Sequence, residues 1–313
     1  MTRLNGSSPP LPTTDMFNEH AGESCFASPF SLNRPQYLAG PVLFDSPHSG
    51  DDYPAYILET TNRAAMDTLT DIKVNYLLRD LPAAGFPTLC AHFPRVMIDL
   101  NRPQLGNAEL IRTVSSRRLL SDNETSLACN VNIDLNELLL RTDNLYSPYH
   151  NTLRSTLNNY RANFGHAVLL DMHSYSKQVV TAEDFGVSHA SAVPDIILGT
   201  NNGLSASNEL TETIAETFRQ NGLSVMINKL FTGAHIVKTY GRPNVNLHAI
   251  QIEMAENYFD RGTGTLLHGE ADHLSATLEK VGNTTLDWLK SQPDYRPAIT
   301  ETDSVFQAQH PNL

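Results

Sequence analysis

The chain has few cysteines and no long apolar run. Its three cysteines, Cys25, Cys90 and Cys129, are far apart, odd in number and outside any Cys-x-x-Cys pair. This pattern argues against a disulfide framework and a thiolate zinc site, and it fits a reducing compartment. No stretch reaches the length of a membrane-spanning helix, and residues 1–12 contain no apolar run of signal-peptide length. We therefore expect a cytoplasmic protein.

Positive charge is also scarce. The 313 residues include 22 Lys and Arg against 34 Asp and Glu, which gives a formal net charge of −12. Nucleic acids and anionic membranes are bound by basic surfaces, so we expect neither as a partner. A small anionic substrate is still compatible with this charge, because a few local arginines suffice to bind it.

Several common catalytic motifs are missing. The sequence contains no Gly-x-Ser-x-Gly elbow, no His-Glu-x-x-His and no Walker loop, which argues against the enzyme classes that these motifs define. Gly262-Thr263-Gly264 lacks the third glycine of a dinucleotide-binding fingerprint, so we discount dinucleotide binding as well.

Strand-like and helix-like segments alternate along the body of the chain. Helical spacing is clear from Leu210 to Phe218, where Ser207 is a candidate N-cap and Gly222 a stop signal. The alternation predicts an α/β fold: a single domain with a mostly parallel mixed sheet flanked by helices. Apolar runs of strand length occur at residues 41–46, 89–100, 167–172, 195–200, 223–228 and 247–254.

The two ends of the chain differ from this body. Residues 1–36 are rich in Ser, Pro and Asn and have few periodic apolar positions, so we expect a flexible N-terminal tail and lead-in. We place the catalytic domain at residues 37–295 and a C-terminal tail at 296–313.

Two histidines follow two of the predicted strands. His48 lies in Ser46-Pro47-His48-Ser49-Gly50, and His173 lies in Asp171-Met172-His173-Ser174. The carboxyl ends of strands in an open α/β sheet gather ligands and catalytic groups, and imidazole is the commonest metal ligand. The pair therefore predicts a metal site. The alternatives are structural: His48 caps a turn, and His173 is buried against Asp171.

A carboxylate would complete such a site, because catalytic zinc uses about three protein ligands. Asp51 lies three residues after His48, a spacing known among zinc peptidases. Asp171 is placed to orient an imidazole rather than to bind the metal itself.

Two arginines and one glutamate are further candidates for substrate binding and catalysis. Arg95 and Asn101-Arg102 lie in residues 93–103, which we interpret as a strand that ends in polar groups. A guanidinium pairs bidentately with a carboxylate, so Asn101 and Arg102 are candidate receptors for a substrate carboxylate. Glu253 lies inside an apolar run, where desolvation raises the pKa of a carboxyl group and suits it to act as a general base. The alternatives are ordinary ion pairs of an arginine with Asp99 or Asp45, and of Glu253 with Lys238 or Arg242.

Five motifs in matching order resemble the N-formylglutamate amidohydrolase family. The resemblance runs from about residue 35 to residue 288 and implies the zinc-carboxypeptidase-like fold that this family resembles, a mixed sheet wrapped by helices. The motifs are Leu43-Phe44-Asp45-Ser46-Pro47-His48-Ser49-Gly50 with Tyr53-Pro54, Val96-Met97-Ile98-Asp99-Leu100-Asn101-Arg102-Pro103, Pro148-Tyr149-His150, Asp171-Met172-His173-Ser174 and Gln251-Ile252-Glu253.

The resemblance implies the metal ligands. His48 and His173 match the two ligand histidines of the family, and one Zn²⁺ per chain is the expected cofactor. The acidic residue that family members carry at the start of the next helix matches Asp71. We prefer Asp71 as the third ligand and keep Asp51 open as the alternative.

The resemblance also implies the catalytic and substrate-binding groups. Glu253 matches the general base, and Arg95 resembles an arginine that polarises the scissile carbonyl. Asn101 and Arg102 match the pair that holds the substrate carboxylate. Arg242, in a predicted loop over the site, either meets a second substrate carboxylate or is a surface charge.

The implied activity is a metal-dependent amidohydrolase that removes a formyl or small acyl group from an N-acyl amino acid such as N-formylglutamate. Such a substrate is small and anionic. Two alternatives stay open: a zinc carboxypeptidase acting on small peptides, and a catalytically silent carboxylate-binding protein on a hydrolase fold. The presence of both histidines, Arg102 and Glu253 argues against the silent protein, because a pure binder needs no base.

Overall fold

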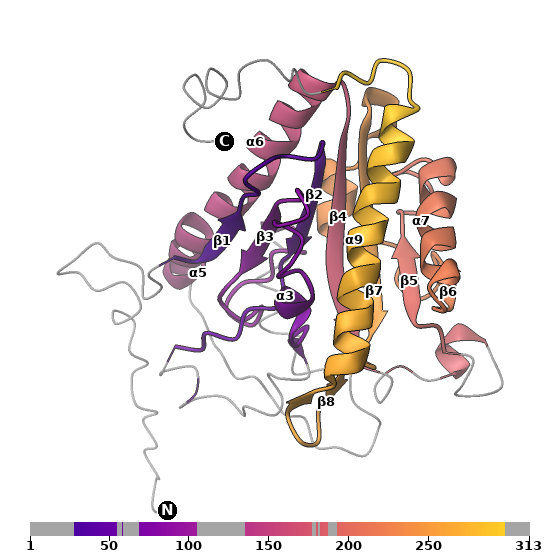
Figure 1. Cartoon of the computed structure of the whole chain (residues 1–313). Helices are drawn as coiled ribbons and strands as arrows, with labels where there is room; N and C mark the ends of the chain where they lie inside the picture. Colours follow the sequence, from indigo (N-terminus) through magenta and orange to yellow (C-terminus); the bar gives the residue numbers. More distant parts are fainter. Residues whose placement is uncertain are drawn as a thin grey trace, which may run out of the picture.

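The computed structural model describes residues 28–54, 58, 69–104, 135–176, 180, 182–186 and 193–297. In this part of the chain a seven-stranded sheet has the strand order β1-β3-β2-β4-β7-β5-β6 (Figure 1). The strands are β1 (Phe30–Asn33), β2 (Val42–Ser46), β3 (Thr88–Ala91), β4 (Ala167–Tyr175), β5 (Ile196–Gly199), β6 (Val225–Ile227) and β7 (Leu247–Ala255).

The sheet is mixed but mostly parallel. Strands β3, β2, β4 and β7 run in parallel, as do β5 and β6, whereas β1 and β5 pair antiparallel with β3 and β7. All nine residues of β4 and all nine of β7 are buried, as expected for central strands covered on both faces. The predicted α/β class with a mostly parallel mixed sheet is confirmed.

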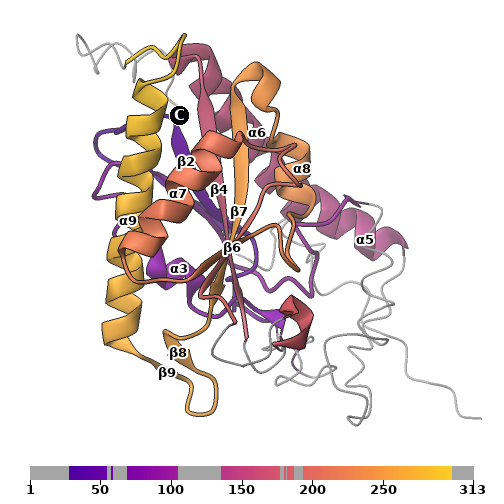
Figure 2. The ribbon, with the colours of Figure 1, turned by 90° about the vertical axis from the view of Figure 1, so that its right-hand side faces the viewer.

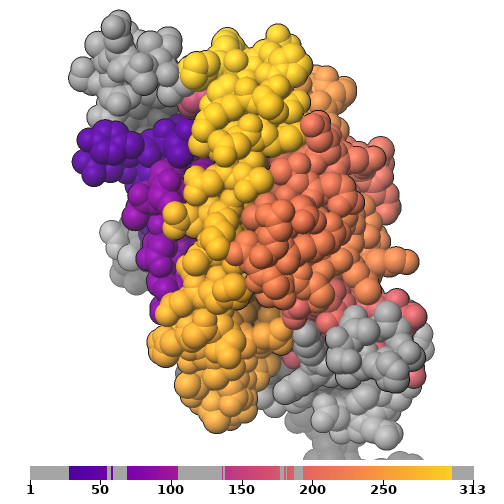
Figure 3. Space-filling model, turned by 45° about the vertical axis from the view of Figure 1, so that its right-hand side comes forward, coloured from indigo at the N-terminus to yellow at the C-terminus, as the bar shows by residue number. Residues whose placement is uncertain are grey.

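Helices cover both faces of the sheet (Figure 2). One face packs against α5 (Leu135–Arg141), the π-helix η2 (Thr142–Tyr146), α6 (Ser147–Phe164) and α8 (His235–Tyr240). The other packs against α3 (Val74–Leu77), α7 (Asn208–Gln220) and α9 (His268–Lys290), and α9 lies beside α7 (Figure 3). Successive residues of β4 serve the two layers in turn: Leu169 belongs to the first core, and Val168 and Leu170 to the second.

Helix α7 begins where the sequence predicts. The Oγ of Ser207 accepts a hydrogen bond from the Leu210 amide (3.3 Å), so Ser207 is the N-cap. Gly222 follows the last helical residue with a φ of 81°, a left-handed conformation that glycine adopts without strain.

The predicted strand at residues 89–100 is wrong beyond Ala91. Pro94 has no amide hydrogen to donate to a ladder, and its carbonyl instead accepts a turn hydrogen bond from the Met97 amide (2.9 Å). The fully buried Arg141 side chain donates to the Met97 carbonyl (2.7 Å). Asn101 and Arg102 therefore lie on a loop held by a buried arginine, rather than at the end of a strand.

Described residues on both sides of the predicted 37–295 range also contact this fold. Strand β1 lies before residue 37 and pairs antiparallel with β3, with Phe30 opposite Ala91. At the other end, the Arg296 amide donates to the Phe164 carbonyl (2.9 Å), which ties this residue to the end of α6. A short hairpin of β8 (Phe259–Asp260) and β9 (Thr265–Leu266) precedes α9.

Among the described residues, no helix combines the length and apolarity needed to cross a bilayer.

Candidate metal and catalytic site

The carboxyl ends of three parallel strands bring the central side chains together. His48 follows β2, whereas His173 and Glu253 lie opposite each other in the ladder between β4 and β7. The turn after His48 closes tightly against a neighbouring loop, because a Cβ on Gly50 would lie 2.3 Å from the Phe93 carbonyl oxygen. Only glycine fits there.

His48, Asp71 and His173 form a buried cluster whose three potential ligand atoms lie within 4.8 Å of one another. Asp71 Oδ2 lies 2.8 Å from His173 Nδ1 and 3.6 Å from His48 Nδ1. The Asp71 amide donates to the His48 carbonyl (3.1 Å), which fixes the two segments together. Tetrahedral zinc with bonds near 2.1 Å places its ligand atoms ~3.4 Å apart, so this spacing is close to that of a metal site.

A second layer of carboxylates orients the two imidazoles. His48 Nε2 donates to Asp99 Oδ1 (2.6 Å), and His173 Nε2 donates to Asp171 Oδ1 (2.8 Å). Both rings therefore turn Nδ1 toward Asp71. His48 Nδ1 is buried and has no hydrogen-bond partner among the described residues. An imidazole held through Nε2 by a carboxylate, with a free Nδ1 facing another ligand, is the usual arrangement at metal centres.

The site contains more acidic than basic groups. Burial alone opposes the charge of Asp99, but Arg95 and His48 hold the pKa of this carboxyl well below its usual value. Burial and the neighbouring Asp171 raise the pKa of the Asp45 carboxyl well above its usual value. A cation bound among these groups would relieve the excess of negative charge. Five carboxyl groups of this region are buried: Asp45, Asp71, Asp99, Asp171 and Glu253.

His173 lies between two of these carboxylates. Burial disfavours the imidazolium, yet Asp171 and Asp71 outweigh it and raise the pKa of His173 well above its usual value. Burial also acts against the Asp71 carboxylate, but the hydrogen bond from His173 and the proximity of His48 hold its pKa below the usual range. The two carboxylates thus favour the protonated, cationic form of His173.

Glu253 is buried beside this cluster. Its Oε1 accepts a hydrogen bond from the Gln251 side chain (2.6 Å), and burial raises its pKa to about 8. Within the part of the chain that the structure describes, neither Lys238 nor Arg242 forms an ion pair with it, contrary to the structural alternative. A carboxyl group with this pKa is poised to gain and lose a proton near neutral pH.

Arg95 and Arg102 meet at one carboxylate. Arg95 donates to Asp99 Oδ2 (2.5 Å), and Arg102 Nε donates to the same oxygen (3.3 Å). The predicted alternative, an ion pair with Asp99, is therefore present for both. Arg102 nevertheless keeps 48% of its side chain exposed and Arg95 keeps 24%, so both remain accessible to a ligand.

Asn101 is held inside the protein. Its Nδ2 donates to Asp171 Oδ2 (3.2 Å), and its Oδ1 accepts from the Ile236 amide at the start of α8 (2.7 Å). The residue is 6% exposed. Both polar atoms of this amide are bonded within the protein, and its contact with a substrate carboxylate stays a prediction. Asn101 joins α8 to the carboxylate that orients His173.

Two predicted candidates lie outside the cluster. Asp51 has a side chain that is 54% exposed and lies 3.8 Å from Lys73 Nζ. Arg242 is exposed and pairs with Leu247 at the amino end of β7. Six residues of strand separate Leu247 from Glu253, or ~20 Å. The structure therefore brings neither Asp51 nor Arg242 to the other site residues.

The sequence analysis missed two residues that complete the site. Asp99 was considered only as an ion-pair partner, and Gln251 was not assigned a role. In a strand, residues two apart share a face, so Gln251 precedes Glu253 on the same face as Asp171 precedes His173. A polar residue two positions before a candidate catalytic residue was therefore the feature of the sequence that could have identified Gln251. Asp99 likewise lies two positions before Asn101, although both residues are on a loop.

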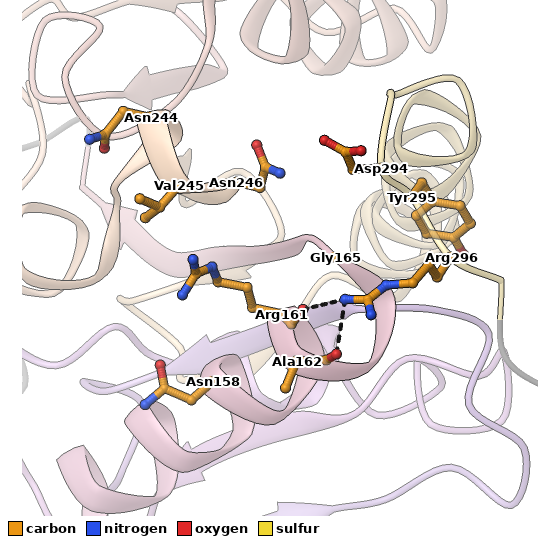
Figure 4. A pocket seen from close by; sticks show the side chains of 10 residues that line it. All are labelled: Asn158, Arg161, Ala162, Gly165, Asn244, Val245, Asn246, Asp294, Tyr295 and Arg296. Atoms are coloured by element: carbon orange, nitrogen blue, oxygen red, sulfur yellow. Dashed lines mark hydrogen bonds between the residues drawn. The ribbon is translucent and has the colours of Figure 1, made fainter.

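A cavity of about 830 Å³ lies at the opposite end of the sheet (Figure 4). It is lined by the end of α6, the turn before β7 and the segment after α9, including Arg161, Asn246 and Arg296. Arg296 caps the carbonyls of Arg161 and Ala162 at the end of α6. This cavity lies at the amino ends of β4 and β7, so it is separate from the histidine cluster.

The raised pKa of Glu253 predicts how stability depends on pH in the metal-free protein. Between its ordinary value of 4.5 and about 8, the folded state retains a proton that the unfolded state has lost, so stability falls as pH rises. Glu253→Gln removes this titrating group, so the variant does not lose stability in this way as pH rises. Urea unfolding in a chelator should show the variant becoming more stable than wild type between pH 5 and 8, by about 2–4 kcal/mol.

Glu279→Gln, an exposed substitution on α9, is the control and should follow the wild-type curve. Parallel curves for wild type and Glu253→Gln would contradict a raised pKa at Glu253.

Comparison with known proteins agrees with this geometry. The N-formylglutamate deformylase of Pseudomonas aeruginosa is 29% identical over 255 residues, covering 79% of this chain and 93% of that protein. The N-formylglutamate deformylase of Pseudomonas putida is 29% identical over 257 residues, with the same coverage. An N-formylglutamate amidohydrolase from Ralstonia eutropha has the same fold, with a TM-score of 0.68 at 24% identity over 84% of this chain and 98% of that one.

The family profile of N-formylglutamate amidohydrolase matches residues 40–259, which include the two histidines, Asp71 and Glu253. The predicted family and the assignment as a hydrolase of amide bonds are therefore confirmed. The chain belongs to the N-formylglutamate amidohydrolase family.

Proposed function

We propose that this protein hydrolyses the amide bond of an N-formyl or small N-acyl amino acid, such as N-formylglutamate. The observation that carries the proposal is Glu253, a buried carboxyl group with a pKa of about 8 at the same sheet edge as the His48–Asp71–His173 cluster. The names of the Pseudomonas relatives support the choice of substrate.

The residues of the cluster fit a divalent metal ion, and we propose zinc. Nδ1 of His48, Nδ1 of His173 and Oδ2 of Asp71 would hold it, and two imidazole nitrogens with one carboxylate oxygen are a common catalytic zinc set. The unpartnered Nδ1 of His48 supports this assignment, because a buried nitrogen without a partner is costly. A bound metal would supply Lewis acidity, which polarises a carbonyl and lowers the pKa of water.

Glu253 performs the proton transfers in this proposal. Its carboxylate takes a proton from the water that attacks the acyl carbon, and the resulting carboxylic acid donates this proton to the departing amine nitrogen. The carbon–nitrogen bond breaks, and a carboxylate and a free amino acid are released. Gln251 orients Glu253 through its 2.6 Å hydrogen bond. General acid–base catalysis of this kind typically contributes ~10²–10⁴-fold in rate.

The two arginines bind the substrate in this proposal. Arg95 donates to the oxygen of the scissile carbonyl as negative charge develops there. Arg102, which is nearly half exposed, binds the α-carboxylate. Because Asp99 holds both guanidinium groups, the amide and the carboxylate of one small substrate are positioned together, which is a proximity effect.

The zinc-loaded protein should be tested on a panel of N-formyl amino acids, N-acetyl amino acids and dipeptides with free carboxyl ends. We expect release of formate from an acidic formyl amino acid to be fastest. Glu253→Gln is the matched control, since it preserves size but accepts no proton at neutral pH, and should turn over ~10²–10⁴-fold more slowly. Preferred cleavage of dipeptides would assign a carboxypeptidase instead, and absence of any turnover would favour a binding protein.

The choice between Asp71 and Asp51 is decided by metal content. Asp71→Ala should lose stoichiometric zinc while remaining folded by circular dichroism, because the substitution removes the carboxylate between the two histidines. Asp51→Ala should retain zinc, because its side chain is exposed and near Lys73. The reverse result, measured by elemental analysis after dialysis, would assign Asp51 as the ligand.

Arg102→Met should raise KM for substrates with a free α-carboxylate more than it lowers kcat. Losing one charged hydrogen bond costs about 1.5–3 kcal/mol, roughly ten- to a hundredfold in kcat/KM. Arg242→Met is the control and should match wild type, because Arg242 lies at the other end of β7. If wild type hydrolyses the carboxamide form of the substrate equally well, Arg102 does not have this role.

A further inference from the structure

A second ion pair lies next to the cluster and has no part in the chemistry described above. Arg261 donates to Glu256 through Nε (2.6 Å) and through a terminal nitrogen (2.6 Å), which makes the pair bidentate. The side chain of Glu256 is 5% exposed and that of Arg261 is 17% exposed. The side chain of Glu256 is therefore buried and held by a cation.

This pair contacts both segments that carry proposed metal ligands. On one side, Ser174, the residue after His173, donates its hydroxyl to Glu256 Oε1 (3.1 Å). On the other side, Arg261 donates to the carbonyl of Thr70, the residue before Asp71 (3.3 Å). The ion pair thus bridges the end of β4 and the Asp71 segment.

Tyr258 adds a contact on the far side of Asp71. Its hydroxyl donates to the carbonyl of Ile72 (3.0 Å), and the side chain is 1% exposed. The carbonyls immediately before and after Asp71 are therefore both held by residues that follow β7. Asp71 itself belongs to no helix or strand, whereas His173 is fixed in the central strand β4.

We infer that Glu256, Tyr258 and Arg261 are positioning residues that hold Asp71 at the two histidines and so set the metal affinity of the site. The inference rests on the proposed function, in which Asp71 is a metal ligand. A loosened Asp71 segment must be ordered again each time a metal binds, and that cost lowers affinity. Loss of outer contacts of this kind typically weakens metal binding 10–100-fold.

Tyr258→Phe is the first test, because it removes only a hydroxyl from a buried ring. Zinc affinity is measured on the folded protein by competition with a chromophoric chelator. Loss of this hydrogen bond should raise the dissociation constant for zinc by about three- to tenfold. Tyr240→Phe is the matched control: it removes another buried hydroxyl that donates to a backbone carbonyl, that of His150, and should leave zinc affinity unchanged.

The ion pair is tested with the double variant Glu256→Gln/Arg261→Met. Arg261→Met alone would leave a buried, unpaired carboxylate, which endangers folding. The double variant should bind zinc about 10–100-fold more weakly, and kcat at saturating zinc should stay within a few-fold of wild type. If the double variant does not fold, the comparison of Tyr258→Phe with Tyr240→Phe decides the question.

Three outcomes separate this inference from the proposed function. Weaker zinc binding by the variants, with Tyr240→Phe unchanged, supports it. Wild-type affinity in variants that merely melt at a lower temperature overturns it and leaves the proposed function intact. A wild-type protein that binds no zinc overturns both the proposed metal site and this inference.

Discussion

The site depends on one buried carboxylate, Asp99. One of its oxygens accepts hydrogen bonds from His48 Nε2 and the Asn101 amide, and the other accepts from Arg95 and Arg102. Because Nε2 of His48 is fixed in this way, Nδ1 must face Asp71. The same carboxylate sets the distance between the imidazole and the two guanidinium groups. A carboxylate has about four lone-pair sites, so these bonds satisfy it, and the proposed metal-binding and substrate-binding halves of the site share a single anchor.

The charges of the site follow from its location in the fold. The carboxyl ends of parallel strands covered on both faces offer little water, so every acid placed there either gains a partner or retains its proton. Asp99 gains Arg95 and Arg102, and Asp171 gains His173. Glu253 is hydrogen-bonded to a neutral amide, and burial outweighs the nearby His173 and raises the pKa of this carboxyl to about 8. The difference between these carboxyl groups is what separates a structural anion from a group able to transfer protons.

The strand-borne part of the site was predictable from the sequence. His48, His173 and Glu253 follow or end apolar runs, and the parallel sheet necessarily brings the carboxyl ends of such runs to one edge. Residue spacing is less informative where the chain leaves the sheet. The spacing favoured Asp51, because this residue lies only three positions after His48. Asp71 is distant from His48 in the sequence, and only the fold brings the two together. Only the family resemblance pointed to Asp71.

The errors elsewhere have similar causes. The run at 89–100 is apolar enough for a strand, but Pro94 ends the ladder and the distant Arg141 holds the resulting loop. Arg242, eleven residues before Glu253, was predicted to lie in a loop over the site, with a surface charge as the alternative. However, those residues include a strand that spans the sheet, so the two lie at opposite ends. The antiparallel pairing of β5 with β7 could not be predicted either, because apolar patterns indicate strands and helices but not strand direction.

The three proposed ligands differ in how firmly the fold holds them. His173 lies within a fully buried central strand, and His48 lies in a turn that only glycine at position 50 allows to close. Asp71 has no such support, and its place depends on its amide bond to His48 and on side chains that follow β7. Metal affinity at the proposed site is therefore most easily altered through the contacts of the Asp71 segment, and the proposed chemistry of Glu253 and the arginines can remain unchanged when this happens.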